Sequence, residues 1–112
     1  MVMAIKRIRS DLPGGIGMNF YNPEDKKDLN FSGEQTINTS TWVPYQKSGK
    51  QIKIQIKDER NNFHVDSEFY LWDDSFKLQC AMHDGIKTIL TVSGDKDIGI
   101  TVSVTGVQAY YV

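Results

Sequence analysis

Two histidines and one carboxylate are the side chains of this chain best suited to metal binding or acid–base chemistry. The 112 residues contain only two histidines, His64 and His83, and Asp66 lies two positions after His64, on the same face of a strand. Two imidazoles and a carboxylate can hold Zn²⁺ with an open fourth position, or divide the roles of general acid and general base. One hypothesis is therefore a small metal-dependent enzyme or metal-binding protein that uses His64, His83 and Asp66.

Aspartates at turns form a second candidate site, for Ca²⁺. Ca²⁺ favours several carboxylate oxygens from flexible loops, and the acidic half of the sequence places aspartates at three turns. In an up-and-down strand order the turns at 73–74 and 94–97 lie at one end of the fold, and Asp84 lies at the other. Aspartate is also a common turn residue because its side chain accepts hydrogen bonds from nearby backbone amides, which explains the pattern without metal. The aspartates concerned are Asp73, Asp74, Asp84, Asp95 and Asp97.

Aromatic side chains beside polar ones predict a binding surface. Tyr70 and Trp72 have the solvent-facing parity of their strand, and flat rings pack against the C–H patches of sugars or lipid headgroups while polar neighbours bond to hydroxyls. We therefore expect a non-enzymatic, lectin-like binding module that recognises a carbohydrate, lipid or protein surface. Burial of the two rings under another sheet or a loop is the alternative. The expected ligand-binding residues are Tyr70, Trp72, Glu68, Lys77 and Gln79.

A predicted hairpin sets the positions of these residues. Apolar residues alternate in 62–72 and again in 75–82, so both apolar sets face the core. A tight turn at Asp73-Asp74 then pairs Trp72 with Ser75. The same register places Phe69 opposite Leu78, Tyr70 opposite Lys77, Glu68 opposite Gln79, and His64 opposite His83.

Charge and motif content narrow the class of protein. The chain has 13 Lys and Arg against 14 Asp and Glu, a net charge of −1, which argues against the broad positive field of a nucleic-acid binder. It lacks the short motifs of serine hydrolases, zinc proteases, phosphate-binding loops and dithiol enzymes. We expect no nucleic-acid partner, and no cofactor beyond the two metal hypotheses, Ca²⁺ and Zn²⁺. An enzyme is less expected than a binding protein.

Strict alternation of apolar and polar residues predicts an all-β fold. Ile52, Ile54 and Ile56 alternate with polar residues, and turn-forming residues recur at roughly ten-residue spacing. Residues 1–112 are therefore expected to form one domain, a single antiparallel β-sandwich or small barrel of seven to nine strands. Residues 2–9 also fit a short amphipathic helix, and 22–34 reads as an exposed loop. The expected strands are 2–9, 16–21, 35–43, 50–58, 62–72, 75–82, 86–93, 97–104 and 107–112.

The same alternation predicts a core and an edge. The strand at 107–112 carries no charge that would discourage pairing, so an assembly protein that self-associates into a homo-oligomer through this edge is a further hypothesis. The expected core residues include Ile54, Phe69, Leu78, Leu90, Ile100 and Val102.

Membrane and export signals are not evident in the sequence. No run approaches the ~18 apolar residues of a membrane span, and no signal-peptide core follows Met1, so we expect a soluble chain without either. The cellular compartment is left open.

Overall fold

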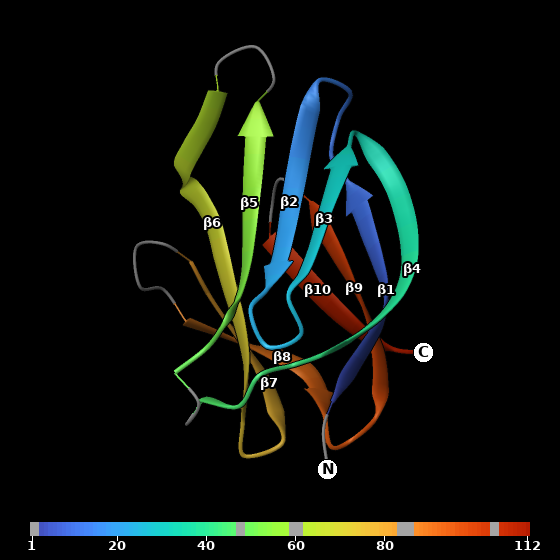
Figure 1. Cartoon of the computed structure of the whole chain (residues 1–112), viewed down its shortest axis with the longest axis vertical. Coiled ribbons are helices and arrows are strands. Elements are labelled where there is room, and N and C mark those ends of the chain that lie inside the picture. Colours follow the sequence, from blue (N-terminus) through green and yellow to red (C-terminus); the bar gives the residue numbers. More distant parts are fainter. Residues whose placement is uncertain (1–2, 47–48, 59–61, 83–86, 104–105) are drawn as a thin grey trace.

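Ten strands in two sheets make up the computed structural model, which describes residues 3–46, 49–58, 62–82, 87–103 and 106–112, without the side chains of 58, 62–67, 82 and 87–89. One sheet has the strand order β3-β2-β5-β6-β7-β8 and the other β10-β9-β1-β4. The two sheets pack as layers of a sandwich (Figure 1). The strands are β1 (Ala4–Asp11), β2 (Ile16–Asn22), β3 (Lys27–Ser32), β4 (Glu34–Trp42), β5 (Ile52–Asp58), β6 (Asn62–Asp74), β7 (Lys77–Met82), β8 (Lys87–Ser93), β9 (Asp97–Ser103) and β10 (Gly106–Tyr111).

The predicted all-β sandwich is confirmed, with ten strands instead of seven to nine. The additional strand is β3, which lies inside the predicted loop 22–34. Phe31 is buried and Leu29 packs against the core, whereas the alternate residues Asp28 and Asn30 are exposed. The charged turn before β3 hides this short alternation in the sequence. Residues 4–11 form a strand, so the helical alternative for 2–9 is wrong.

The four-stranded sheet departs from the predicted antiparallel, up-and-down arrangement. β1 lies between two partners: it is antiparallel to β4 and parallel to β9. Ile8, for example, pairs with Ile37 of β4 and with Ile100 of β9. The first strand of the chain is therefore an interior strand of its sheet, and β10 and β4 are the edges.

One hydrophobic core fills the space between the sheets. The six core residues predicted from alternation are all buried, which confirms that prediction. Among the largest fully buried side chains are Phe20 and Leu71 from one sheet and Ile5 from the other. Cys80 shares this core, and burial raises the pKa of its thiol to about 11, so the thiol stays protonated at neutral pH. Cys80 thus acts as a small core residue.

A β-bulge interrupts β1 at Lys6. The register of β1 shifts between Ile5 and Arg7 in its pairing with both neighbouring strands. Ile5 and Ile8 are both fully buried, so the two residues between them lie on the opposite, outer face of the sheet. In a regular strand consecutive side chains point to opposite faces; the extra residue places Lys6 and Arg7 on the same face.

Candidate functional site

The β6–β7 hairpin carries the predicted binding residues in a different register from the expected one. Trp72 pairs with Gln79, not with Ser75, and Phe69 pairs with Met82, not with Leu78. The turn residues are Ser75 and Phe76, with φ of 55° and 65°, the left-handed conformation that a two-residue hairpin turn of type I′ requires. The predicted turn at Asp73-Asp74 is wrong, since both residues belong to β6. The partners of β6 residues shift by four, an even number, so strand residues keep their predicted faces.

Four of the five predicted ligand-binding residues come together on the outer face of the six-stranded sheet. Glu68, Tyr70 and Trp72 alternate along β6, and Gln79 lies opposite Trp72. Lys77 lies apart at the end of the hairpin, opposite Asp74, and is exposed. The expected pairs Tyr70–Lys77 and Glu68–Gln79 do not form within this register.

Most of the side chains in this cluster are buried, so they are not open to a ligand. The Trp72 side chain is only 3% exposed, and Glu68 and Gln79 are also buried, whereas Tyr70 is half-buried. The expectation that the Trp72 ring is exposed is therefore wrong. Alternation identifies the side of the sheet that a residue occupies but not whether that side is covered. The ligand-binding role of the five residues stays a prediction, and among them Lys77 and Tyr70 are the accessible ones.

Glu68 is the centre of a polar network on this face. Its Oε2 accepts a hydrogen bond of 2.5 Å from the Tyr70 hydroxyl, and its Oε1 accepts one of 3.2 Å from Gln55 Nε2. Lys53 Nζ lies 3.8 Å from the same Oε1. The bond to Glu68, followed by burial and the carboxylate charge, raises the pKa of Tyr70. The network satisfies a buried carboxylate and fixes the Tyr70 hydroxyl as a donor.

The predicted histidine site depends on a register that the structure does not have. The pairing of His64 with His83 requires the turn at Asp73-Asp74, which is wrong. The side chains of His64 and Asp66, and all of His83, lie outside the described residues. Among the residues that are described, no group of three or more His, Cys, Asp or Glu side chains is placed to hold a metal ion.

The turns proposed for Ca²⁺ are brought together only in part. The amide of Gly94 donates a hydrogen bond of 2.7 Å to the carbonyl of Phe76, so the turn at Gly94 lies at the same end of the sandwich as the Ser75-Phe76 turn, which replaces the predicted turn at 73–74. Asp73, however, is a buried strand residue and not a loop ligand. Asp84 lies outside the described residues. Two of the turns are therefore neighbours, but the described part of the chain has no cluster of carboxylates that could hold Ca²⁺.

Asp73 is an unusual buried acid. It is 1% exposed, and neither carboxylate oxygen has a hydrogen bond of ordinary geometry from the residues described. Burial raises the pKa of Asp73 above 3.8. The neighbouring Asp74 charge also raises it, and the backbone N–H of Phe76 opposes both by favouring the charged form. A buried carboxylate with so little compensation destabilises the folded state when it is ionised.

Replacing Asp73 with asparagine should therefore stabilise the protein at pH 7, by about 1–3 kcal/mol. Because the folded-state pKa is raised, ionisation costs stability at pH values above that pKa, and this cost disappears as the pH falls toward the unfolded value of 3.8. Urea unfolding at pH 7 and at pH 4 should show the advantage of Asp73→Asn shrinking on acidification. A variant that is less stable than the wild type at pH 7 would show that the carboxylate is compensated.

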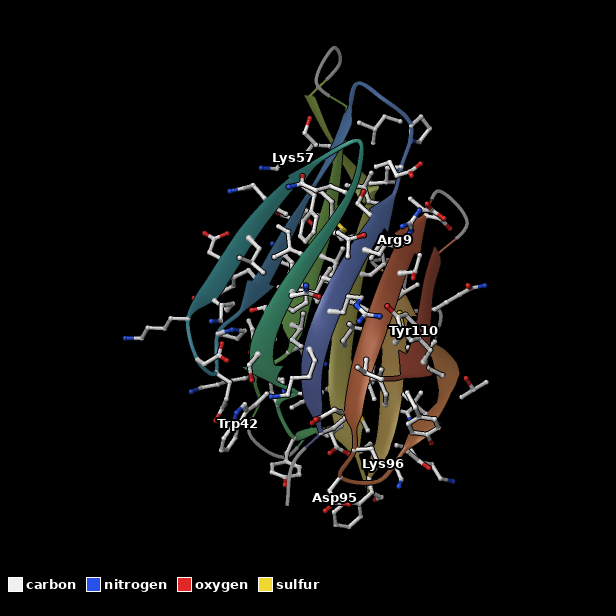
Figure 2. The ribbon with its side chains drawn as sticks, turned by 90° about the vertical axis from the view of Figure 1, so that its right-hand side faces the viewer. Arg9, Trp42, Lys57, Asp95, Lys96 and Tyr110 are labelled. Atoms are coloured by element: carbon white, nitrogen blue, oxygen red, sulfur yellow. The ribbon has the colours of Figure 1, made fainter. Side chains whose placement is uncertain are left out.

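Exposed aromatic residues lie at one end of the sandwich, and the sequence alone did not predict that they come together there. Trp42 is 54% exposed and Phe76 53%. Trp42 pairs with Ala4 next to Asp97, and Figure 2 shows Trp42 at the same end as Asp95 and Lys96. We call this surface the aromatic end. It consists of the exposed residues Trp42, Tyr45, Phe76 and Tyr111, with Val112 beside them.

Contacts between the loops fix the aromatic end. Tyr45 forms a parallel bridge with Asp73 of β6, close to the β6–β7 turn that contains Phe76. The hydroxyl of Tyr111 bonds to the backbone of Ser93, which precedes the turn that contacts Phe76. The remaining exposed large aromatic residue among those described, Tyr21, lies on the outer face of β2.

The backbone of Trp42 is held by a buried polar network. Asn22 Nδ2 donates to the Trp42 carbonyl and to Thr41 Oγ1, at 2.5 and 2.7 Å. Thr41 Oγ1 donates in turn to Asp25 Oδ2 at 2.6 Å. Asn22 and Thr41 are fully buried. This network joins the β2–β3 turn of one sheet to β4 of the other and positions the exposed Trp42 ring.

Phe76 is the most unusual residue of this end. A left-handed backbone is uncommon for a bulky side chain, and the turn positions of such hairpins are usually glycine or asparagine. Its ring is also exposed, so the residue accepts backbone strain without burying its side chain. Phenylalanine in a short polar stretch, Asp-Asp-Ser-Phe-Lys, is the sequence signal that marks this site.

Comparison with protein-family models, with curated proteins and with solved structures finds no match. No helix in the described residues is long and apolar enough to cross a membrane. The protein is thus described by its fold, an all-β sandwich of two sheets, and by the aromatic end.

Proposed function

We propose that this protein is a non-enzymatic binding module that recognises a lipid-headgroup surface through the aromatic end. The observation that supports the proposal is the gathering of exposed Trp, Tyr and Phe side chains at one end of the sandwich. Exposed apolar residues are ordinarily scattered singly, and a contiguous group marks an interaction site. Trp and Tyr favour the interface between lipid and water because an apolar ring and a polar tip suit both sides.

Phe76 supports this function separately. Local backbone strain that brings no packing gain is a reason to look for a role in binding. The Phe76 ring lies at the tip of a hairpin and is exposed, so insertion into the headgroup region buries it without moving the core. The exposed Trp42 ring lies at the same end of the sandwich (Figure 2).

A carbohydrate is the second candidate ligand, and Tyr70 is the observation that favours it. Its hydroxyl is fixed by Glu68 and its ring is half-buried, which suits recognition of a sugar by a ring with oriented polar neighbours. The aromatic end differs, because its rings come from separate elements: Trp42 and Tyr111 from the ends of β4 and β10, and Phe76 from the β6–β7 turn. That arrangement suits a broad, fluid surface better than one sugar.

Self-association is the third candidate. β10 is an edge strand, as the sequence predicts, and an open edge can pair with another chain. The Tyr111 hydroxyl, however, bonds to Ser93 of the other sheet and draws one end of β10 toward β8.

The proposed function predicts that the protein cosediments with phosphatidylcholine vesicles, with and without an anionic lipid. Phe76→Ser should weaken binding about tenfold to a hundredfold, because burying a Phe side chain contributes ~1.5–3 kcal/mol. Tyr21→Ser, which removes an exposed ring from the sheet face, is the matched control and should bind as the wild type does.

Absence of vesicle binding by the wild type, or unchanged binding by Phe76→Ser, would contradict the proposal. Retention on a glycan array without vesicle binding, lost in Tyr70→Ala, would assign the function to the carbohydrate candidate. A mass that rises with protein concentration, without binding to vesicles or glycans, would assign it to self-association.

A further inference from the structure

We propose that the outer face of the four-stranded sheet is a second binding surface, which takes a carboxylate-bearing polysaccharide at Lys6 and Arg7. This proposal is independent of the aromatic end and of the lipid function. It rests on the β-bulge in β1, on the partners of the two cations, and on the side chains of the strands beside them. Figure 2 looks onto this face, with Arg9 and Tyr110 labelled.

The bulge gives this face two adjacent cations whose charges are not neutralised. Lys6 Nζ donates to Ser40 Oγ at 2.9 Å, and Arg7 Nε donates to Asn38 Oδ1 at 3.5 Å. Both acceptors are neutral, and within the described part of the chain neither cation lies within ion-pairing distance of a carboxylate. Bulges commonly re-aim side chains at functional positions. Here the bulge aims both charges at solvent, where an anion can reach them.

Arg9, the third cation of β1, differs from these two. It forms ion pairs with Asp11 at 3.1 Å and with Glu34 at 3.2 Å. The uncompensated charge of this strand is therefore confined to the bulge. An arginine fork and a nearby ammonium are suited to a carboxylate, because charge-assisted hydrogen bonds are the strong ones.

An aromatic ring lies beside the cations. Gly99 of β9 pairs with Arg7 on one side and with Tyr110 of β10 on the other. The phenol end of Tyr110 covers Gly99, since a Cβ on Gly99 would lie 2.4 Å from Tyr110 Cζ. Arg7, Gly99 and Tyr110 thus form one row across three strands. A half-buried tyrosine next to an arginine offers a surface for the C–H face of a sugar ring.

The rest of the face consists largely of neutral hydrogen-bonding side chains. Hydroxyl and amide groups on an open sheet match the hydroxyls of a sugar chain. These side chains come from β4, β9 and β10, on both sides of the cations, and alternate with core-facing residues. They are Thr36, Asn38, Ser40, Thr101, Ser103 and Gln108.

The same features favour a uronate polymer over a nucleic acid. Single-stranded nucleic acid uses stacking platforms for successive bases and a positively charged groove along the backbone. Near the bulge this face offers the Tyr110 ring and the two cations Lys6 and Arg7. Trp42 lies at one end of the face, opposite Ala4, and the carboxylates of Asp11 and Glu34 lie at the other end. A polysaccharide of uronate sugars presents free hydroxyls beside each carboxylate and a C–H face on each ring, which match the neutral hydrogen-bonding side chains and the Tyr110 ring around the two cations.

Affinity electrophoresis of the full chain in gels that contain polygalacturonate tests the proposal. We expect the wild type to be retarded by polygalacturonate and not by neutral dextran, and the retardation to decrease with salt. The double variant Lys6→Gln with Arg7→Gln should bind about a hundredfold more weakly, or about tenfold for each charge-assisted hydrogen bond removed. The matched control, Lys57→Gln with Lys96→Gln, removes the same charge from exposed positions outside this face and should bind as the wild type does.

Tyr110→Ala should also weaken binding, whereas Phe76→Ser should not, which separates this surface from the aromatic end. The Lys6/Arg7 double variant should have the same Tm as the wild type, because both side chains are on the surface. Equal loss in the two double variants, unchanged binding of the Lys6/Arg7 variant, or no retardation of the wild type would overturn the proposal. Tighter binding to single-stranded oligothymidylate than to polygalacturonate would overturn the assignment of the ligand.

Discussion

Truncating Trp72 to alanine is expected to destabilise the folded protein by about 3–5 kcal/mol, the usual cost of removing a large buried aromatic side chain. Trp72 lies on the outer face of the six-stranded sheet, where an exposed ring would contribute little. Its side chain is nevertheless 3% exposed and lies opposite the buried Gln79. The expected loss is a large part of the roughly 5–15 kcal/mol by which domains are ordinarily stable.

Urea unfolding of Trp72→Ala, monitored by circular dichroism, measures this loss. Phe76→Ala is the matched control, because it truncates an aromatic ring that is exposed at the end of the same hairpin. The control should change the free energy of unfolding by no more than about 0.5 kcal/mol. Equal midpoints for Trp72→Ala and the wild type would show that the ring is exposed in solution.

Phe20→Ala should have an effect of similar size, for a different reason. Phe20 is fully buried between the sheets, and its neighbours across β3 and β5 are Leu29 and Ile54. Truncation leaves a cavity that the rigid sheets cannot close, at a cost of about 3–5 kcal/mol. In a domain near this size each kcal/mol lowers Tm by roughly 4–8 °C, so the transition should fall by more than about 10 °C.

Thermal unfolding of Phe20→Ala and of Tyr21→Ala, one residue along β2, provides the comparison. Tyr21 is on the outer face and exposed, so its truncation should leave Tm nearly unchanged. A small shift for Phe20→Ala together with a large one for Tyr21→Ala would mean that the two faces of β2 are exchanged.

The faces of the strands could be predicted from the sequence, but their pairing could not. Ile54, Ile100 and Val102 are buried as expected because period-two alternation reports directly on the side of a sheet. The predicted hairpin register is wrong because Asp73-Asp74 is the more usual turn pair, whereas the turn residues are Ser75 and Phe76. Phe76, expected in the core, is therefore exposed. Local turn preference is overruled by the pairing of β7 with residues 69–74 of β6.

The sequence also could not predict whether an outward-facing side chain is covered by other residues. Trp72 and Trp42 both have outward parity, yet the first is buried and the second exposed. The difference comes from what packs against each ring, which depends on residues far apart in the chain. The aromatic end is a set of this kind, because Trp42 and Tyr111 come from the ends of β4 and β10 and Phe76 comes from the β6–β7 turn. The histidine site was inferred from one register between two strands, and β6 and β7 pair in another.

The parallel pairing of β1 with β9 has a consequence for how the chain reaches its folded state. Most neighbours in the six-stranded sheet are also consecutive in sequence, so those hairpins close over short loops. Ala4, by contrast, finds its partner at Asp97, and a long loop must close before that pairing stabilises anything. During synthesis the backbone edge of β1 that pairs with β9 therefore stays without its partner until β9 itself has left the ribosome. The four-stranded sheet is thus the late-forming half of the molecule, and the interval before β9 arrives is when the chain is most exposed to aggregation.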